Sequence, residues 1–203
     1  MPVKRYDPSA DLGESYLFDD FPGLLYNNRI WSARGGAGTI TIPASCIGGQ
    51  VQVRGNASNY YELYVNLLSF TVARKFEISW CVKLTDLTSR QSCWGLCGAT
   101  SPAEAVCFQY DSAVSANWYI VAITSSVATQ TDTGIAADTN WHEFRVAGNT
   151  GVATYFIDNV PAGNVTTNLP AGSLSPFCRS TSSDAGATKD TLVDWVEVYG
   201  DRI

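Results

Sequence analysis

The segment of residues 141–163 most strongly limits what this chain can fold into. Apolar and polar residues alternate in 142–147 and again in 152–157, and a break rich in glycine and asparagine, residues 148–151, separates the two runs. Such alternation is typical of strands with one buried face, and a short break of this kind joins two strands into a hairpin. Asn159 follows the second run at a position where we expect a turn. Asparagine suits this position because it tolerates a left-handed backbone. The segment therefore predicts a β-hairpin.

Strand patterns of this kind continue along most of the chain, whereas long amphipathic helical patterns are absent. We predict roughly fourteen strands, at the spacing expected of a sandwich or barrel. They are Ile30–Ser32, Thr39–Ile42, Gln50–Arg54, Glu62–Asn66, Phe76–Leu84, Cys93–Gly98, Ala105–Tyr110, Asn117–Thr124, Val127–Thr131, His142–Ala147, Val152–Ile157, Pro161–Val165, Phe177–Ser180 and Thr191–Tyr199. A chain of 203 residues suits one large all-β domain, so we predict an extended N-terminal arm, residues 1–28, and a single sandwich domain, residues 29–203.

The net charge of −6 is unevenly distributed, because residues 6–28 contain five acidic and no basic side chains. Binding to phosphate backbones requires clustered lysine and arginine, so we expect no nucleic-acid partner. No stretch approaches the roughly 20 apolar residues that cross a bilayer, and the first residues lack the apolar core of a signal peptide. We therefore expect no membrane partner and a protein that is made and kept in a cytoplasm.

Two motifs resemble those of concanavalin-A-like lectin and glucanase domains, including the laminarinase type. The hairpin opens on Trp141-His142 and closes on Tyr-x-Ile-Asp-Asn, and the last strand reads Val-Asp-Trp-Val-Glu-Val-Tyr over residues 193–199. The resemblance extends loosely over residues 29–203. It implies an all-β jelly roll, a β-sandwich of two antiparallel sheets.

Three earlier segments are similar to lectin-like domains in structural proteins of tailed bacteriophages. They are Tyr16-Leu17-Phe18-Asp19-Asp20-Phe21, Arg29-Ile30-Trp31 and Gly48-Gly49-Gln50-Val51-Gln52-Val53. Such domains serve as capsid decorations, fibres or tail-attached adhesins. The similarity implies a role in a virion.

Catalytic motifs are missing from the sequence. Laminarinase-type enzymes carry Glu-x-Asp-x-x-Glu on one strand, because retaining hydrolysis needs two carboxyl groups about 5 Å apart. This chain has no such triplet, and we expect its isolated strand carboxylates to face solvent: Glu62, Glu77, Glu143 and Glu197. The single histidine, His142, has no Gly-x-Ser-x-Gly elbow to accompany it, so we expect an ordinary hydrogen-bonded strand residue. These observations predict a protein that is not an enzyme.

Six cysteines raise the question of a zinc site. Cys93 and Cys97 are on the same side of an extended strand, and at about 3.3 Å per residue they lie too far apart to chelate one ion with Cys107. We expect most of the cysteines to be buried thiols. The cysteines therefore predict no zinc site, and we predict no resident cofactor from them.

Calcium is the metal that the resemblance implies, because concanavalin-A-like folds often hold it with aspartate and backbone oxygens. Asp19, Asp20 and Asp194 are the candidate ligands, if the first segment and the last strand meet at one sheet edge. The alternative, which we favour, is that these carboxylates cap turns or pair with Arg29 or Arg202.

Sugar binding requires flat aromatic faces beside polar groups. Tyr60, Tyr61, Trp118 and Tyr119 are the candidates for such a platform, although large aromatic residues of a sandwich more often pack in the core.

The apolar residues of the arm are the candidates for partner binding: Tyr16, Phe18, Phe21, Leu24 and Leu25. They either pack along the edge of their own domain, which terminus base rates favour, or reach a neighbouring subunit. The combined interpretation is a non-enzymatic bacteriophage virion structural protein. It predicts capsid or tail proteins as partners, a homo-oligomer or symmetric array, and a location in the virion after assembly in the host cytoplasm. A carbohydrate-binding adhesin for host glycans is the second hypothesis, and a divergent polysaccharide hydrolase is the third.

Overall fold

The computed structural model describes residues 14–21, 30–36, 38–43, 49–56, 59–65, 69–98 and 101–201. Within these ranges the chain forms fifteen β-strands joined by turns, and no helix. The described part of the chain accordingly contains no helix that is long and apolar enough to span a membrane.

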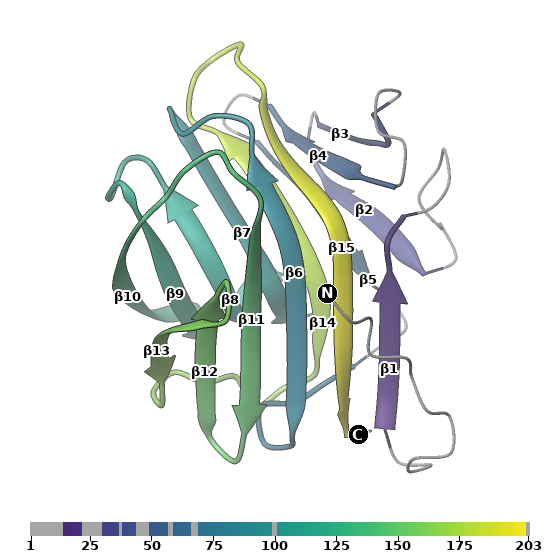
Figure 1. The fold of residues 1–203 in the computed structure, drawn as a ribbon, viewed down its shortest axis with the longest axis vertical. Helices are drawn as coiled ribbons and strands as arrows, with labels where there is room; N and C mark the ends of the chain where they lie inside the picture. The colour runs from purple at the N-terminus through teal and green to yellow at the C-terminus, as the bar shows by residue number, and fades with distance from the viewer. Residues whose placement is uncertain are drawn as a thin grey trace.

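Eight strands form the sheet that lies in front in Figure 1. Seven of them follow the order β13-β12-β11-β6-β15-β4-β3, and β1 joins them by pairing with β15. Strand β15 is long enough to pair with β4 through residues 189–193 and with β1 through residues 196–201. The strands are β1 (Glu14–Asp19), β3 (Thr39–Thr41), β4 (Val51–Gly55), β6 (Phe76–Leu84), β11 (His142–Asn149), β12 (Val152–Ile157), β13 (Val160–Val165) and β15 (Lys189–Asp201).

The second sheet has seven strands in the order β10-β9-β8-β7-β14-β5-β2, and every recorded pair of neighbours in both sheets is antiparallel. Its strands are β2 (Trp31–Gly35), β5 (Tyr60–Val65), β7 (Arg90–Gly98), β8 (Ser101–Asp111), β9 (Asn117–Thr124), β10 (Val127–Ala136) and β14 (Leu174–Ser182). The predicted antiparallel β-sandwich is thus confirmed, and each of the fourteen predicted strands overlaps an observed one.

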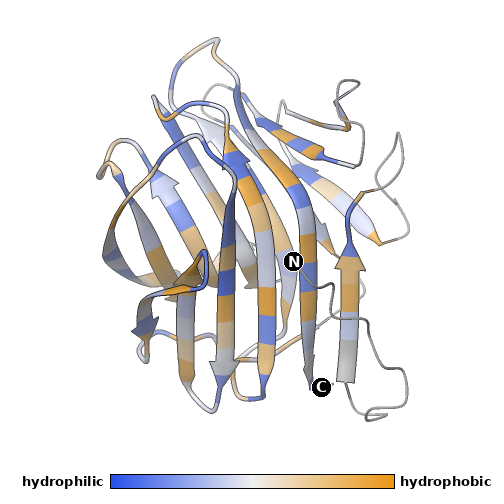
Figure 2. Cartoon of the chain, viewed as in Figure 1, coloured by the Kyte–Doolittle hydropathy of each residue, from blue (hydrophilic) through white to orange (hydrophobic). Residues whose placement is uncertain are grey.

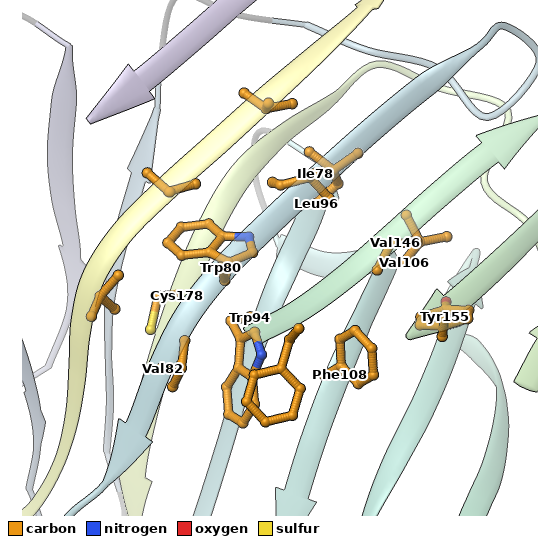
Figure 3. Packing of buried hydrophobic residues seen from close by; sticks show 14 of the residues in the cluster. Ile78, Trp80, Val82, Trp94, Leu96, Val106, Phe108, Val146, Tyr155 and Cys178 are labelled. Atoms are coloured by element: carbon orange, nitrogen blue, oxygen red, sulfur yellow. The ribbon is translucent and has the colours of Figure 1, made fainter. Parts of the chain in front are cut away.

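The core lies between the two sheets, where alternate side chains of each strand meet. In β6 the residues Phe76, Ile78, Trp80, Val82 and Leu84 are at most 2% exposed, as their alternation predicts. Figure 2 shows the matching change from hydrophobic to hydrophilic residues along β6 and β15. Strands β6 and β7 contribute Trp80 and Trp94 to the core, beside Phe108 and Tyr155 (Figure 3).

Tight turns fix the predicted hairpin. Strands β11 and β12 pair from Phe144↔Ile157 to Asn149↔Val152, and the turn between them has φ of 47° at Thr150 and 86° at Gly151. The next turn, from β12 to β13, has φ of 51° at Asp158 and 65° at Asn159. Asparagine therefore takes the left-handed position that the sequence assigned to it.

Candidate functional site

The register of the seven-stranded sheet aligns seven side chains in one row across its outer face. The pairs Arg34↔Glu62, Glu62↔Arg179 and Arg179↔Cys93 connect β2, β5, β14 and β7, and Cys93↔Gln109, Gln109↔Tyr119 and Tyr119↔Asp132 continue through β8 and β9 to β10. Directly opposite residues in an antiparallel pair project from the same face. With strands about 4.8 Å apart, the row is roughly 29 Å long. We call these residues the polar row: Arg34, Glu62, Arg179, Cys93, Gln109, Tyr119 and Asp132.

Glu62 lies between the two arginines of the polar row and pairs with both. Its Oε1 accepts from Arg34 Nε at 2.7 Å and its Oε2 accepts from Arg179 Nε at 2.8 Å, and the residue is 0% exposed. The two guanidinium groups also lie over tyrosine rings, Arg34 over Tyr64 at 4.5 Å and Arg179 over Tyr60 at 3.9 Å. The expectation that Glu62 is isolated and faces solvent is therefore wrong, because two arginines from neighbouring strands enclose its carboxylate.

The other three carboxylates of that group remain partly accessible on the outer face of the eight-stranded sheet. Glu77 pairs with Arg145 at 3.4 Å, and Glu197 accepts from the Tyr16 hydroxyl at 3.2 Å. Burial raises the pKa of Glu143, an effect that Arg145 opposes. Glu77 and Glu197 are thus partnered rather than isolated.

A second apolar cluster lies on the same face as the polar row and shares Tyr119 with it. It is separate from the core between the sheets and consists of Cys97, Ala105, Cys107, Tyr119, Val121 and Phe177. Burial raises the pKa of the Cys93 thiol to about 12 and also raises the pKa of Cys107. Thiols with such pKa values stay protonated near neutral pH, so they do not act as nucleophiles there.

Two carboxylates of this outer face reach solvent at the side formed by β8 and β10. Asp132 is exposed, and hydrogen bonds from the Gly134 backbone and the Asn117 side chain lower its pKa. Asp111 is half-buried, lies opposite Gln91, and accepts a hydrogen bond from the Gln91 amide at 2.9 Å. Both carboxylates therefore have fixed positions at one end of the face.

His142 connects the end of β12 to the loop before β11. Its Nδ1 is 2.6 Å from Asp158 Oδ2 and its Nε2 is 2.9 Å from Asp138 Oδ1, which requires a proton on both ring nitrogens. Burial alone would lower the pKa of His142, but the hydrogen bonds to Asp158 and Asp138 outweigh it and raise the pKa. The residue thus holds two turns together, in agreement with the hydrogen-bonded role expected from the sequence.

The free energy of unfolding is expected to fall as the pH rises through the pKa of folded His142. A pKa that is raised in the folded state stabilises the fold below the unfolded value of about 6.5 and loses that effect at higher pH. Since the ring is partly exposed, we expect a loss of less than about 1 kcal/mol. Urea unfolding between about pH 6 and pH 9 measures it, and His142→Gln is the control because the chain has no other histidine. An equal slope in the variant would contradict the assignment.

The four aromatic candidates for a sugar platform divide between the two faces of the sheet. Tyr60 is 39% exposed on the outer face, and Tyr119 belongs to the apolar cluster there. Trp118 lies in the core against Trp94, with ring centroids 5.8 Å apart, and Tyr61 is half-buried on the inner side of β5. Adjacent strand residues point in opposite directions, so the structure does not bring the four rings together. Their sugar binding stays a prediction.

The described part of the predicted arm is attached to the sandwich edge. Residues 14–19 form β1, which pairs with β15, and Phe21 is only 2% exposed. Phe18 is 44% exposed, and Tyr16 is half-buried. Leu24 and Leu25 lie outside the described residues. A partner for these side chains and the division into an arm and a domain stay predictions.

The three calcium candidates come from the two strands that meet at this edge. Asp19 accepts hydrogen bonds from the Phe21 backbone at 2.8 Å and from Trp31 Nε1 at 2.7 Å, which is the turn-capping role that we favoured. Burial raises the pKa of Asp194, and the negative charge of Asp20 raises it further. A hydrogen bond from Gln50 lowers this pKa and so opposes both effects. The described residues contain no group of three histidine, cysteine or acidic side chains arranged to hold a metal. Calcium binding by Asp19, Asp20 and Asp194 stays a prediction.

Comparisons with solved structures show the fold. No protein-family model and no curated protein sequence matches the chain. A β-1,3-1,4-glucanase (lichenase) from a mouse hindgut metagenome has a TM-score of 0.70 at 11% identity, covering 93% of this chain and 100% of that one. An endo-acting O-glycanase of human gut microbiota has a TM-score of 0.70 at 10% identity, and the match covers 92% of this chain and 98% of that one. A Mycobacterium tuberculosis antigen described as a pseudo β-1,3-glucanase has a TM-score of 0.66 at 14% identity, and the match covers 92% of this chain and 98% of that one.

The chain therefore has the concanavalin A-like jelly-roll fold of glycoside hydrolases, as the two sequence motifs implied. The expectation of a non-enzymatic virion structural protein is wrong, because two of these neighbours are a lichenase and an O-glycanase, the third is described as a pseudo β-1,3-glucanase, and none is named as a viral protein. That expectation depended on the missing Glu-x-Asp-x-x-Glu triplet and on short phage-like segments. The predicted virion location and capsid or tail partners are not tested by the structure.

Proposed function

We propose that this chain acts on a polysaccharide as a glycoside hydrolase, and that the glycan lies on the outer face of the seven-stranded sheet. The observation that carries the proposal is the fold, which matches solved glycan hydrolases over nearly the full length of both chains. The names of those neighbours indicate glucan and O-glycan chains as the substrate classes to test.

The polar row supplies the groups that sugar recognition needs. Sugar hydroxyls both donate and accept hydrogen bonds, and the row offers guanidinium donors, an amide and a carboxylate. Glu62 fixes the planes of Arg34 and Arg179, so their geometry is set before any ligand binds. A row of roughly 29 Å across the strands suits an extended polymer rather than a single sugar.

We infer that cleavage occurs at the side of the face where Asp111 and Asp132 lie. Glycoside hydrolysis uses two carboxyl groups that touch the substrate. Glu62 is 0% exposed and is neutralised by two arginines, whereas Asp111 and Asp132 reach solvent. Among the described residues of β2, β5, β14 and β7, Glu62 is the only carboxylate on the outer face. Asp132, whose pKa is lowered, supplies a stable negative charge near a cationic transition state.

Release of reducing ends from β-1,3-1,4-glucan, β-1,3-glucan and mucin O-glycans tests the proposal, and we expect cleavage of at least one. Asp111→Asn and Asp132→Asn are each expected to lower the rate by about a hundredfold or more. Asp184→Asn, in an exposed loop, is the matched control and should leave the rate unchanged. No cleavage of any of these glycans, together with no binding in affinity electrophoresis, would overturn the proposal. Unchanged rates in both variants would exclude these carboxylates.

A further inference from the structure

A hollow of about 220 Å³ lies on the outer face of the other, eight-stranded sheet. The start of β6, the β11–β12 hairpin and the end of β15 line this open hollow, and these segments meet at the lower end of the front sheet in Figure 1. It is therefore on the opposite side of the sandwich from the polar row.

The hollow exists because a short side chain stands in a row of longer ones. The register aligns Thr154, Ala147, Glu77 and Tyr199 across β12, β11, β6 and β15. Ala147 reaches less far from the sheet than its neighbours Thr154 and Glu77 on the two sides. The depression is thus built into the regular sheet.

Polar groups of both hydrogen-bonding kinds surround the hollow. Burial and the nearby Glu77 carboxylate raise the pKa of Tyr199 to about 12, and Arg145 pairs with Glu77 at 3.4 Å while its guanidinium lies 3.8 Å from the centre of the Phe156 ring. The contacts of Arg145 hold the Glu77 carboxylate and the Phe156 ring in place. Asn149 is exposed at the rim, where its side-chain oxygen accepts from Thr150.

Cationic and anionic side chains both line the hollow. Lys75 is exposed and forms no ion pair with the described residues, and Glu77 carries the opposite charge. The opposite charges of Lys75 and Glu77 leave the lining without a net charge, so it favours neither an anion nor a cation, and a single carboxylate is too few for a metal ion. An apolar ligand would cover Lys75 and Asn149 without forming hydrogen bonds to them.

We propose that this hollow binds one neutral sugar residue, as a second glycan site on the face opposite the polar row. A sugar ring offers hydroxyls that donate to Glu77 and accept from Lys75 and Asn149, while its apolar face packs against Tyr199. The volume is below the roughly 300 Å³ at which drug-sized pockets begin, which limits the ligand to one ring. The site depends on the hollow alone and does not require the proposed hydrolysis.

NMR titration of the full chain with methyl β-D-glucoside tests the site. We expect saturable shifts of the amides around Ala147 and Glu77, in the millimolar range typical of weak sites. Ala147→Leu fills the hollow and should abolish them. Lys83→Leu, on the same strand and face as Glu77 but at the other end of β6, is the matched control and should retain them.

Tyr199→Phe covers the case in which Ala147→Leu does not fold. It keeps the ring, removes the hydroxyl beside Glu77, and should weaken sugar binding about threefold to tenfold. Absence of saturable shifts, or shifts that persist in a folded Ala147→Leu variant, would overturn this site. Because Ala147 is on the far face, polysaccharide cleavage should be equal in Ala147→Leu and the wild type, so the two proposals fail separately.

Discussion

Glu62→Gln is expected to lower the free energy of unfolding by about 3 kcal/mol or more. The carboxylate neutralises two guanidinium groups, and the side chains of Arg34 and Arg179 are only 19% and 12% exposed. A glutamine has nearly the same shape, so it adds no cavity. It leaves two cations close together with little water to screen them, and it offers them one acceptor in place of a carboxylate. Urea unfolding at neutral pH, with the variant and the wild type at one salt concentration, measures the difference.

A surface pair of the same chemistry gives the matched control. Arg54 and Asp190 form a two-point contact at 2.7 and 2.8 Å, but the Arg54 side chain is 41% exposed. Asp190→Asn should therefore cost no more than about 1 kcal/mol. Arg34→Gln combined with Glu62→Gln should recover part of the loss, because one of the two cations that the Glu62 carboxylate neutralised is then absent. A Glu62→Gln variant as stable as the wild type would mean that the arginines do not depend on this carboxylate.

Local pattern was enough to predict the strands, since the bounds of β6, β9 and β12 match the sequence prediction residue for residue. Strand β1 was missed for a physical reason. Its pairing with β15 joins residues about 180 positions apart, and among its described side chains Leu17 alone faces the core. An edge strand with so little alternation has no local signal, and the Pro and Gly residues around it indicate a loop instead.

The polar row could not be predicted, because it depends on lateral register. Arg34, Glu62 and Arg179 are far apart in sequence and meet only when β2, β5 and β14 pair at particular residues. A shift of one residue in any of these pairings would turn a side chain to the inner face. Seen alone, Glu62 is one glutamate in a strand of tyrosines. The nearest available signal was the alternation in β5, which places Tyr60, Glu62 and Tyr64 on one face and Leu63 and Val65 on the other.

Gly95→Ala is expected to destabilise the fold by about 4 kcal/mol or more, or to prevent folding. Gly95 lies in the middle of β7, opposite Cys107, and has φ of 151°. A Cβ there would be 2.4 Å from the Val106 carbonyl oxygen and 2.7 Å from Cys107 Cα, and backbone atoms of a neighbouring strand cannot rotate away. The β7–β8 pairing must therefore open, which would separate Cys93 from Gln109 in the polar row. Thermal unfolding and the fraction of soluble protein measure the effect.

Two other glycines separate the steric cause from the conformational one. A Cβ at Gly134, with φ of 69°, or at Gly172 would meet no atom within 4 Å. Gly134→Ala should therefore cost only the strain of a left-handed alanine, about 1 to 2 kcal/mol. Gly172→Ala should be neutral or stabilise by up to about 1 kcal/mol, because alanine restricts the unfolded chain. Gly95→Ala would lose no more stability than Gly134→Ala only if the β8 backbone at Val106 could move aside at little cost in free energy. That result would mean that the central strands of the polar row are less rigid than their close packing implies.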